Sequence, residues 1–485
     1  MADDDVEFSA REGEVHALVG ENGAGKTTLM NILYGLVRPD RGTISVDGRQ
    51  VQISHPNDAI HLGIGIVHQH FQLVPSFSVA ENIMLGREPG ALGLLRTAAE
   101  REQVGRLAEE FGLAVDPGAR IRDLPVGMQQ RVEILKALER RARILILDEP
   151  TSVLTPQEAR ELFKVVRGLA ASGRTVIFIT HKLLEVLEVA DRVSVMRKGR
   201  MVDTVAVRET SVEALARMMV GREVLLSIDR SPREPGQLVL ETENLSVAGP
   251  GGIPAVLRVS LAVREREILG VAGVNGNGQA ELVEAIAGLR PVDVGRIRFL
   301  GAEVSRLSVR QRRLQGMAHI PEDRMRVGLN TSTTLDENLI VSRYRIPQFN
   351  RLGFLRRGEI RRFSESTIAR FSIAAARPGG GISTLSGGNL QKVVLGRELA
   401  GKPRLIIANQ PTRGLDVGSI EAVHKTLLAE RDRGAAILLV SVELDEILAL
   451  SDRVVVLFRG RVNGELSSAD ATEEKLGILM AGGSL

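Results

Sequence analysis

The chain has 485 residues, of which 44% are hydrophobic and 25% are charged, and its formal net charge is +3. This composition is that of a globular protein, and the absence of cysteine excludes disulfides and thiolate metal sites. The near-neutral charge and the 3% aromatic content argue against binding to nucleic acid, and no apolar run approaches the ~18 residues that span a bilayer.

An internal repeat divides the chain. Residues 14–48 and 267–301 align without a gap at an offset of 253, and 12 of the 35 positions are identical. A repeat of this length indicates two copies of one domain. Two prolines and a glycine within residues 231–236 predict a linker. We therefore expect a first domain over residues 1–225, a linker over 226–237 and a second domain over 238–485.

Apolar runs alternate with helical stretches in the first copy. Residues 14–19, 144–147 and 175–179 are predicted strands, residues 25–33 are a predicted helix, and residues from about 79 to 140 are mostly helical. Apolar strands separated by helices are typical of a parallel sheet that is buried on both faces. The predicted fold class is α/β, with a mostly parallel sheet core and a helical subdomain in each copy.

A phosphate-binding motif follows the first predicted strand. Eight consecutive residues satisfy the pattern G-x-x-x-x-G-K-[ST], namely Gly20, Glu21, Asn22, Gly23, Ala24, Gly25, Lys26 and Thr27. The glycines allow backbone N–H groups to point at phosphate oxygens, and the helix that follows adds its positive end. We expect Lys26 to contact the β and γ phosphates, the Thr27 hydroxyl to ligate Mg²⁺, and Thr28 to complete the nucleotide-binding set.

Two carboxylates and a histidine follow later strands. Asp148 and Glu149 end the apolar run 144–147, and His181 comes directly after the run 175–179. Asp148 is predicted to hold Mg²⁺, and Glu149 is predicted to be the general base that orients the attacking water. His181 is expected near the γ-phosphate, because ligands bind at the carboxyl edge of parallel strands.

These motifs together resemble the ATP-binding subunit of an ABC transporter, over nearly the whole chain. Gln69 matches the family's Q-loop, which implies a catalytic and Mg²⁺-contacting residue. Asp148 and Glu149 match the Walker B segment, and His181 matches the H-switch. The signature motif of the family is matched in the second copy, which implies further ATP contacts from Ser386, Gly387, Gly388, Asn389 and Gln391. The resemblance implies two tandem P-loop ABC nucleotide-binding domains with Mg²⁺ as cofactor.

The second copy lacks the residues that would carry the chemistry. Lys26 corresponds to Gln279 and Thr27 to Ala280, and from Pro125 onward the offset between the copies becomes 261. At that offset the pairs are Asp148 with Asn409, Glu149 with Gln410, and His181 with Val442. The first copy in turn has Pro125-Val126-Gly127 where the second has Ser386-Gly387-Gly388. In the family, ATP lies between the phosphate loop of one domain and the signature of the other. The resemblance therefore implies one hydrolytic site and one degenerate site.

The tandem arrangement and the segment 411–416 are similar to importers of simple sugars and to their nucleoside-importing relatives. The resemblance implies an ATPase on the cytoplasmic face of the membrane, with integral-membrane permease subunits as partners and, indirectly, an extracytoplasmic solute-binding protein. Segments after Gln69 and after Glu322 are expected to contact the permease, with Phe71 and Phe77 as docking residues. The alternative is a soluble tandem ABC ATPase that acts on the ribosome or on nucleic acid.

Two further features of the sequence bear on this hypothesis. Only 13 residues precede Glu14, and Phe8 is the only aromatic residue before Gly20. The family usually has an adenine-stacking aromatic residue in this region, so either the start codon is misplaced or adenine is held less well. Seven arginines lie within residues 343–362, interleaved with Tyr344, Phe349 and Phe354. This segment looks like a nucleic-acid patch, but we interpret it as a solvated face or a face toward a partner subunit.

Overall fold

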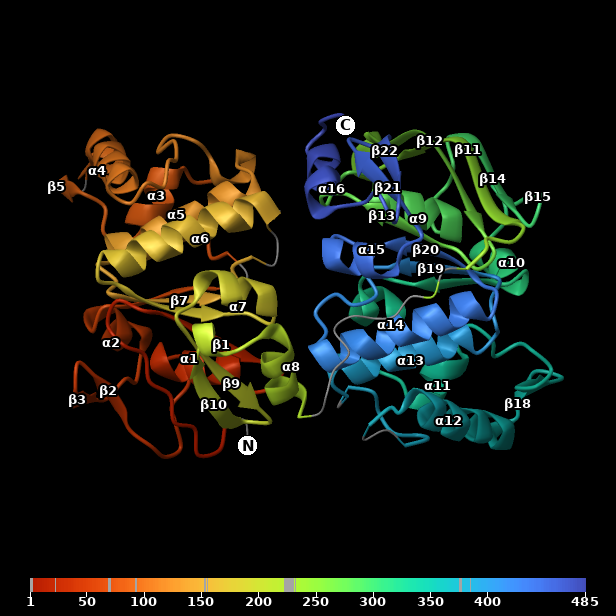
Figure 1. Ribbon diagram of the computed structural model, residues 1–485, viewed down its shortest axis with the longest axis horizontal. Helices are drawn as coiled ribbons and strands as arrows, with labels where there is room; N and C mark the ends of the chain where they lie inside the picture. The colour runs from red at the N-terminus through yellow and green to blue at the C-terminus, as the bar shows by residue number, and fades with distance from the viewer. Residues whose placement is uncertain are drawn as a thin grey trace. The chain divides into compact units, whose positions relative to one another are not determined.

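The computed structural model describes residues 3–21, 23–68, 71–91, 94–151, 154, 156–221, 231, 233–374, 377–383 and 385–485. The chain divides into two compact units, residues 1–224 and residues 225–485, which we call unit 1 and unit 2. Unit 1 is coloured red to yellow-green in Figure 1, and unit 2 is coloured green to blue. Residues 226–230 and 232 of the predicted linker lie outside the described residues.

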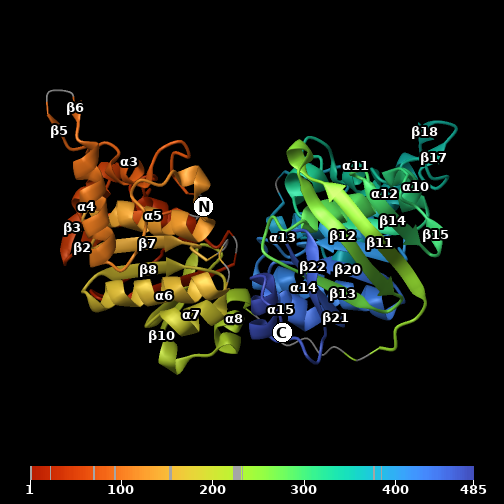
Figure 2. The ribbon, with the colours of Figure 1, turned by 90° about the horizontal axis from the view of Figure 1, so that it is seen from above.

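A six-stranded sheet in the order β10-β9-β1-β8-β7-β4 forms the core of unit 1. Neighbouring strands are parallel, except that β10 returns antiparallel to β9 at one edge. Strands β1 and β8 are buried along their whole length, because a helix covers each face of the sheet. Helix α1 (Lys26–Leu33) packs on one face through Met30, and α6 (Pro156–Ala171) lies along β8 on the other (Figure 2), where Phe163 contacts Phe178. The strands are β1 (Val15–Gly20), β4 (Ile64–Val67), β7 (Ile144–Asp148), β8 (Thr175–Ile179), β9 (Arg192–Arg197) and β10 (Arg200–Ala206).

The helices of unit 1 form two groups. Those that flank the sheet are α1 (Lys26–Leu33), α2 (Pro56–His61), α6 (Pro156–Ala171), α7 (Leu183–Val189) and α8 (Val212–Val220), with the 3₁₀ turn η2 (Val207–Glu209). The helical subdomain contains α3 (Val79–Met84), α4 (Thr97–Glu110), the 3₁₀ turn η1 (Ile121–Asp123) and α5 (Val126–Glu139). It also contains a short hairpin of β5 (Gly90–Ala91) and β6 (Leu94–Leu95), which the sequence pattern did not predict.

Unit 2 repeats the core sheet in the order β16-β19-β20-β13-β21-β22. Again only the edge strand β22 is antiparallel to its neighbour. Its strands are β13 (Ile268–Ala272), β16 (Met317–Ile320), β19 (Leu405–Asn409), β20 (Ala436–Val440), β21 (Arg453–Phe458) and β22 (Arg461–Ser467). The predicted α/β class, with a mostly parallel sheet in each copy, is confirmed.

A second, antiparallel sheet distinguishes unit 2 from unit 1. It contains β11 (Leu238–Ala248), β12 (Pro254–Arg264), β14 (Val294–Phe299) and β15 (Ala302–Glu303). Apolar residues of β11 and β12 pack against Leu269 on β13. The described part of unit 1 has only the hairpin β2 (Ile44–Val46) and β3 (Arg49–Val51) in the place of β14 and β15. His16 occupies the position of Leu269 there, and Phe8 contacts it edge-on with ring centroids 5.0 Å apart.

The helices of unit 2 follow the same plan as those of unit 1. They are α9 (Gln279–Ala287), α10 (Val309–Leu314), α11 (Leu335–Ile340), α12 (Arg357–Phe371), α13 (Gly387–Leu399), α14 (Val417–Asp432), α15 (Leu444–Leu450) and α16 (Glu473–Met480), with η3 (Pro250–Gly252) and the π-helical turn η4 (Arg324–Gly328). A hairpin of β17 (Asn350–Arg351) and β18 (Phe354–Leu355) precedes α12. Among the described residues, no helix is both long enough and apolar enough to span a bilayer.

Candidate functional site

The phosphate loop of unit 1 lies between β1 and α1. Gly25 is the N-cap of α1 with a φ of 106°, and Gly23 has a φ of 81°, which are left-handed values that favour glycine. Gly20 is needed for a different reason, because a Cβ there would lie 2.4 Å from the carbonyl oxygen of Met196. The first turn of α1 has no acidic side chain, so no negative charge in that turn opposes an anion at the positive end of the helix.

Lys26 folds back over the loop to which it belongs. Its Nζ donates hydrogen bonds to the carbonyl oxygens of Gly20 at 2.7 Å and Glu21 at 3.1 Å, and the residue is buried. Thr27 is exposed and Thr28 is half-buried in the same turn of α1. A lysine, a hydroxyl and a helix N-terminus therefore lie together, which is a donor set suited to a phosphate and its Mg²⁺. Asn22 lies outside the described residues.

The carboxylates of Asp148, at the end of β7, and of Glu149, which follows it, have pKa values shifted in opposite directions. Burial, followed by the charge of Glu149, raises the pKa of Asp148 to about 6, although Lys26 acts in the opposite direction. Burial also acts to raise the pKa of Glu149, but the hydrogen bond from His181 and the charge of Lys26 outweigh it, and that pKa is lowered. Glu149 therefore keeps its negative charge at pH values where Asp148 begins to take up a proton.

His181 and Glu149 meet at the carboxyl edge of the sheet. Nδ1 of His181 lies 3.0 Å from Oε1 of Glu149, because the two residues follow β8 and β7, which are neighbouring parallel strands. Their side chains are 19% and 16% exposed, so both are sheltered but reachable. Ligands of parallel α/β sheets bind at this edge. Gln69, the remaining catalytic candidate, lies outside the described residues.

Unit 2 keeps the shape of this site without its charged groups. Gln410 has a φ of 50°, close to the 47° of Glu149. Nε2 of Gln279 donates to the carbonyl oxygen of Val274 at 3.1 Å, which is the counterpart of the bond from Lys26 to Glu21. The side-chain amide of Gln279 therefore makes the same kind of hydrogen bond to its loop as the ammonium group of Lys26, but it supplies no positive charge. Asn409 is buried at the end of β19.

The signature candidates surround the start of α13 in unit 2. Ser386 is the N-cap of α13, and its Oγ accepts a hydrogen bond from Nδ2 of Asn389 at 2.9 Å. The Oδ1 of Asn389 accepts from the backbone N–H of Ala374 at 2.9 Å. Gln391 is 2% exposed, and its amide donates to the carbonyl oxygen of Pro411 at 2.7 Å. The side chain of Gln391 is therefore engaged inside unit 2.

Arg324 supports the signature segment, although the sequence pattern did not single it out. Its guanidinium donates to the carbonyl oxygens of Arg413 at 2.7 Å and Gly414 at 3.3 Å. It also lies 3.0 Å from where a Cβ of Gly387 would be. The available signal was an arginine directly after the acidic pair that follows β16, but its partners are about 90 positions away and show no periodicity.

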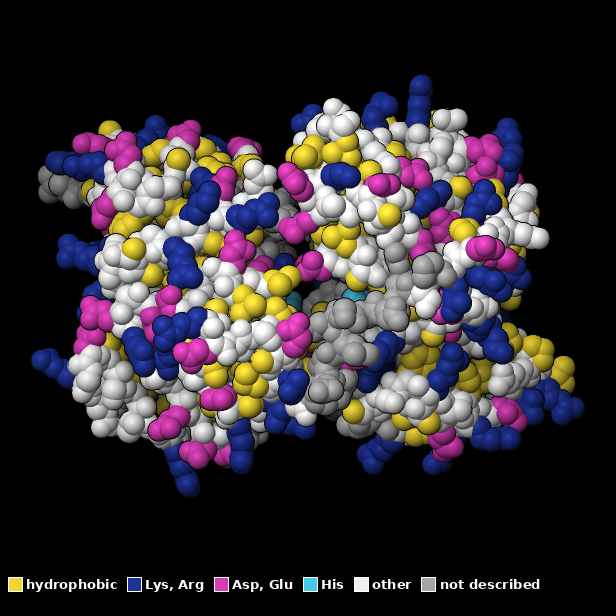
Figure 3. All heavy atoms as spheres, viewed as in Figure 1, with side chains coloured by type: hydrophobic (Ala, Val, Ile, Leu, Met, Phe, Trp, Pro, Cys, Tyr) yellow, Lys and Arg dark blue, Asp and Glu magenta, His cyan; other side chains and the backbone are white. Residues whose placement is uncertain are grey.

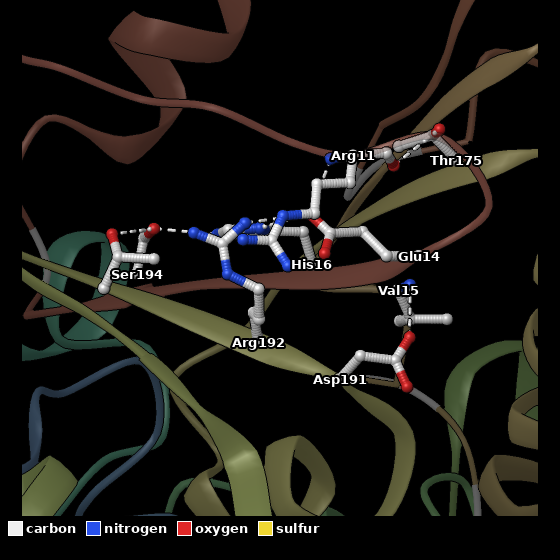
Figure 4. Close-up of polar contacts among 9 residues, drawn as sticks. Arg11, Glu14, Val15, His16, Thr175, Asp191, Arg192 and Ser194 are labelled. Atoms are coloured by element: carbon white, nitrogen blue, oxygen red, sulfur yellow. Dashed lines mark hydrogen bonds and ion pairs between the residues drawn. The ribbon is translucent and has the colours of Figure 1, made fainter.

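A buried polar network joins β1, β9 and β10 (Figure 4). His16 is fully buried. Its Nδ1 lies 3.0 Å from Oε1 of Glu14, and its Nε2 lies 2.7 Å from Oγ of Ser194, which in turn lies 2.7 Å from Oγ1 of Thr204. Arg192 donates to Glu14 at 3.3 Å. Burial lowers the pKa of His16 despite the carboxylate of Glu14. This network is a structural feature of unit 1 that the sequence analysis did not identify.

Comparisons with known proteins agree with this geometry. The profile of the ABC transporter family matches residues 4–152 and 256–413. The chain is 46% identical over 482 residues to the guanosine import ATP-binding protein NupO of Bacillus subtilis (strain 168), covering 99% of this chain and 94% of that protein. It is 42% identical over 484 residues to the ribose import ATP-binding protein RbsA 1 of Rubrobacter xylanophilus, covering 99% and 95%.

Among solved structures, the complex of the archaeal ribosome recycling factor aABCE1 with the ribosomal stalk protein aP1 is similar in fold. The TM-score is 0.62 at 21% identity, covering 95% of this chain and 87% of that chain. At this identity the likeness shows the fold alone. The family profile, together with relatives that align along almost the whole chain, establishes that the chain belongs to the ABC transporter family, with two ATP-binding domains in tandem.

Proposed function

We propose that the chain binds Mg·ATP and hydrolyses it at the phosphate loop of unit 1, and that this drives a membrane importer. The observation that carries the proposal is the Glu149–His181 pair, joined at 3.0 Å, beside Asp148 and Lys26. The charge of Lys26 reaches both carboxylates, since it acts on both of their pKa values. A cation, a metal-binding carboxylate and a base thus share one edge of one sheet.

Each group has a distinct part in the proposed hydrolysis. The loop N–H groups and Lys26 bind the phosphates, and Thr27 with Asp148 would hold Mg²⁺, which supplies positive charge to the phosphate oxygens. Glu149 accepts a proton from the attacking water, and its lowered pKa keeps it ionised. His181 fixes the orientation of Glu149 through their hydrogen bond. Gln69 is proposed to contact Mg²⁺ and the water.

The signature segment of unit 2 is proposed to complete this one site. Ser386, Gly387, Gly388 and Asn389 would supply a hydroxyl, an amide and backbone N–H groups to the nucleotide. The proposal rests on the residues that each unit contains. Unit 1 has the intact phosphate loop, while unit 2 has the intact signature. Gln279, Asn409 and Gln410 are correspondingly proposed to form a site that does not hydrolyse ATP, because an amide cannot accept the proton that a base must take.

An apolar surface of unit 2 is the proposed permease contact. A cavity of about 110 Å³ opens between α9, α10, β16 and η4, with Val327, Leu289 and His319 in its wall. Burial lowers the pKa of His319 to about 4, so this side chain is neutral at pH 7. Arg312, Arg313 and Arg397 also line the cavity. Leu289 and Val327 in its wall are strongly exposed for apolar side chains, and so are Leu314 in α10 and Met325 in η4. Contiguous exposed apolar residues mark interaction surfaces. In unit 1, Phe71 and Phe77 are half-buried.

The solute is proposed to be a nucleoside or a simple sugar, since the names of the two relatives refer to guanosine and to ribose. The higher identity to the guanosine importer favours the nucleoside. The chain would act at the cytoplasmic face of the membrane, with a permease as direct partner and a solute-binding protein as indirect partner. Nucleic acid is not an expected partner.

The test is ATP hydrolysis and solute uptake by the chain assembled with the membrane proteins that co-purify with it. Lys26→Ala is expected to abolish both activities, and the matched variant Gln279→Ala is expected to leave hydrolysis within about twofold of the native rate, because only Lys26 supplies a charge-assisted phosphate contact. If both variants lost activity equally, the division into one hydrolytic and one degenerate site would be wrong. If no membrane protein co-purified with the chain, the transport proposal would fail.

A further inference from the structure

The hairpin β17–β18 of unit 2 ends in an unusually exposed apolar tip. Leu352 is 91% exposed and Phe354 is 79% exposed. Phe349 at the base of the hairpin is fully buried and contacts Phe363 with ring centroids 5.1 Å apart, so it is not the accessible aromatic that the sequence suggested. A small core that includes Phe349, Ile340 and Ile360 holds the base in place. The tip therefore projects from a fixed support.

Arginines surround this tip. Residues 343–362 contain seven arginines and one acidic residue, Glu359, which is a net charge of +6. Glu359 pairs with Arg362 at 2.6 Å and with Arg356 at 3.6 Å. Within the described part of the chain, no acidic partner is found for Arg351 or Arg357. Figure 3 shows hydrophobic and basic side chains next to each other at this hairpin, at the right edge of the view.

Unit 1 has the same hairpin without the charge. Its strands β5 and β6 correspond to β17 and β18 at an offset of 260, and the sequences of residues 92–96 and 352–356 both contain Leu-Gly followed by an apolar residue, Leu and Arg. The equivalent segment, residues 83–102, has three arginines and three glutamates, and its net charge is zero. The basic character is therefore specific to unit 2 and is not a requirement of the hairpin fold.

We propose that the hairpin β17–β18 and the first turns of α12 bind an anionic lipid surface, with Leu352 and Phe354 entering the headgroup region and the surrounding arginines contacting lipid phosphates. Apolar side chains at the tip of a basic segment are typical of interfacial membrane anchors. A nucleic acid would use the arginines and could stack on Phe354, but it would gain nothing from Leu352, which is the most exposed apolar side chain of the tip. A protein partner is less favoured, because it would have to supply acidic side chains to match a segment of net charge +6, whereas an anionic bilayer presents phosphates over its whole surface.

The test is flotation of the full chain with lipid vesicles, without permease and without ATP, so that its outcome is independent of the proposed transport function. We expect binding to vesicles that contain phosphatidylglycerol and little binding to pure phosphatidylcholine. Binding should weaken as salt is raised. Leu352→Ser/Phe354→Ser should reduce binding at least tenfold. Arg351→Gln/Arg357→Gln should reduce it about 25-fold, since each arginine near an anionic surface contributes roughly fivefold.

Matched controls lie elsewhere in unit 2. Ile253 is 71% exposed, so Ile253→Ser removes a comparable apolar side chain. Arg264→Gln/Arg266→Gln removes two charges from exposed positions, one at the end of β12 and one in the turn that follows it. Both controls should bind vesicles as the native chain does. Equal losses in controls and hairpin variants would overturn the proposal. The proposal would also be overturned if the native chain did not bind anionic vesicles. In that case, weaker binding of the hairpin variants to a permease in detergent or to a labelled nucleic acid would identify the partner instead.

Discussion

Nδ1 of His181 lies 3.0 Å from Oε1 of Glu149, although the residues are 32 positions apart in the chain. The contact exists because β7 and β8 are neighbours in the sheet, so the residues that follow them emerge side by side. The contact with His181 helps to lower the pKa of Glu149, which burial alone would raise. Val442 and Gln410 occupy the same places in unit 2, where the backbone N–H of Val442 approaches Oε1 of Gln410 at 3.4 Å.

Glu149→Gln should stop ATP turnover and leave ATP binding intact. The amide keeps the size of the side chain but cannot accept a proton, and losing such a base costs about 10²- to 10⁴-fold in rate. Gln410→Glu should change turnover little, because unit 2 has Gln279 and Val442 where unit 1 has Lys26 and His181. Steady-state hydrolysis and the affinity for a fluorescent ATP analogue check both variants. A Glu149→Gln protein with a tenth or more of the native rate would contradict the assignment.

Hydrolysis should fall as the pH decreases through about 6, the pKa of Asp148. A buried acid with a raised pKa is protonated in this range, and a protonated carboxyl group cannot hold Mg²⁺. Mg²⁺ and the proton compete for the same oxygen atoms, so tenfold more Mg²⁺ should move the midpoint to lower pH. The measurement is the pH profile of hydrolysis at two Mg²⁺ concentrations. A midpoint that did not respond to Mg²⁺ would argue against Asp148 as the titrating group.

Gly388→Ala should destabilise unit 2, and Gly387→Ala should have little effect on its stability. A Cβ at Gly388 would lie 2.2 Å from Oγ of Ser419, whose backbone N–H is held by the N-cap residue Asp416 of α14 at 2.8 Å. Separating α13 from α14 should cost about 1–3 kcal/mol. The atom nearest to a Cβ at Gly387 is the end of the flexible Arg324 side chain. Thermal unfolding of both variants provides the comparison, and equal melting temperatures would refute the prediction.

The His16 network should make unit 1 sensitive to acid. The folded pKa of His16 is lowered, so the folded state binds fewer protons than the unfolded state, and stability is lost as the pH falls through the unfolded value of about 6.5. His16→Leu/Ser194→Val installs the pair that unit 2 has at Leu269 and Val455. This variant should lose less stability than the native chain between pH 7.5 and pH 5.5 in thermal unfolding.

A single variant separates the pH effect from ordinary packing. Ser194→Val leaves Nε2 of His16 buried without its 2.7 Å partner, which should cost about 1–3 kcal/mol at pH 7.5. The double variant should recover most of that loss, because no unpartnered ring nitrogen remains. If single and double variants were equally destabilised at both pH values, the network would not be the source of the acid sensitivity.

The sequence was sufficient for the fold class and for the local motifs. Lys26, Asp148 and Glu149 belong to short patterns whose spacing follows from a strand, a loop and a helix, and the predicted strands at residues 144–147 and 175–179 lie where β7 and β8 lie. The contacts of Arg324 with Arg413 and of His16 with Ser194 could not be predicted. Each joins residues far apart in the chain, and neither leaves a periodic pattern, because only tertiary packing brings the partners together. The sequence showed that Gln279 stands in the second copy where the first copy has Lys26. It did not show that Gln279 donates a hydrogen bond to the loop.

The buried network of His16 also bears on how a chain with two similar units folds correctly. While both units are being synthesised and folded, strand β1 could pair with β21 of the other unit in place of β9, because the repeats share strand order. That exchange would place His16 beside Val455, without the hydroxyl of Ser194. A buried ring nitrogen would lose its partner, which is a penalty that correct pairing avoids. The differing side chains thus discourage strand exchange between the repeats, a known hazard of tandem domains.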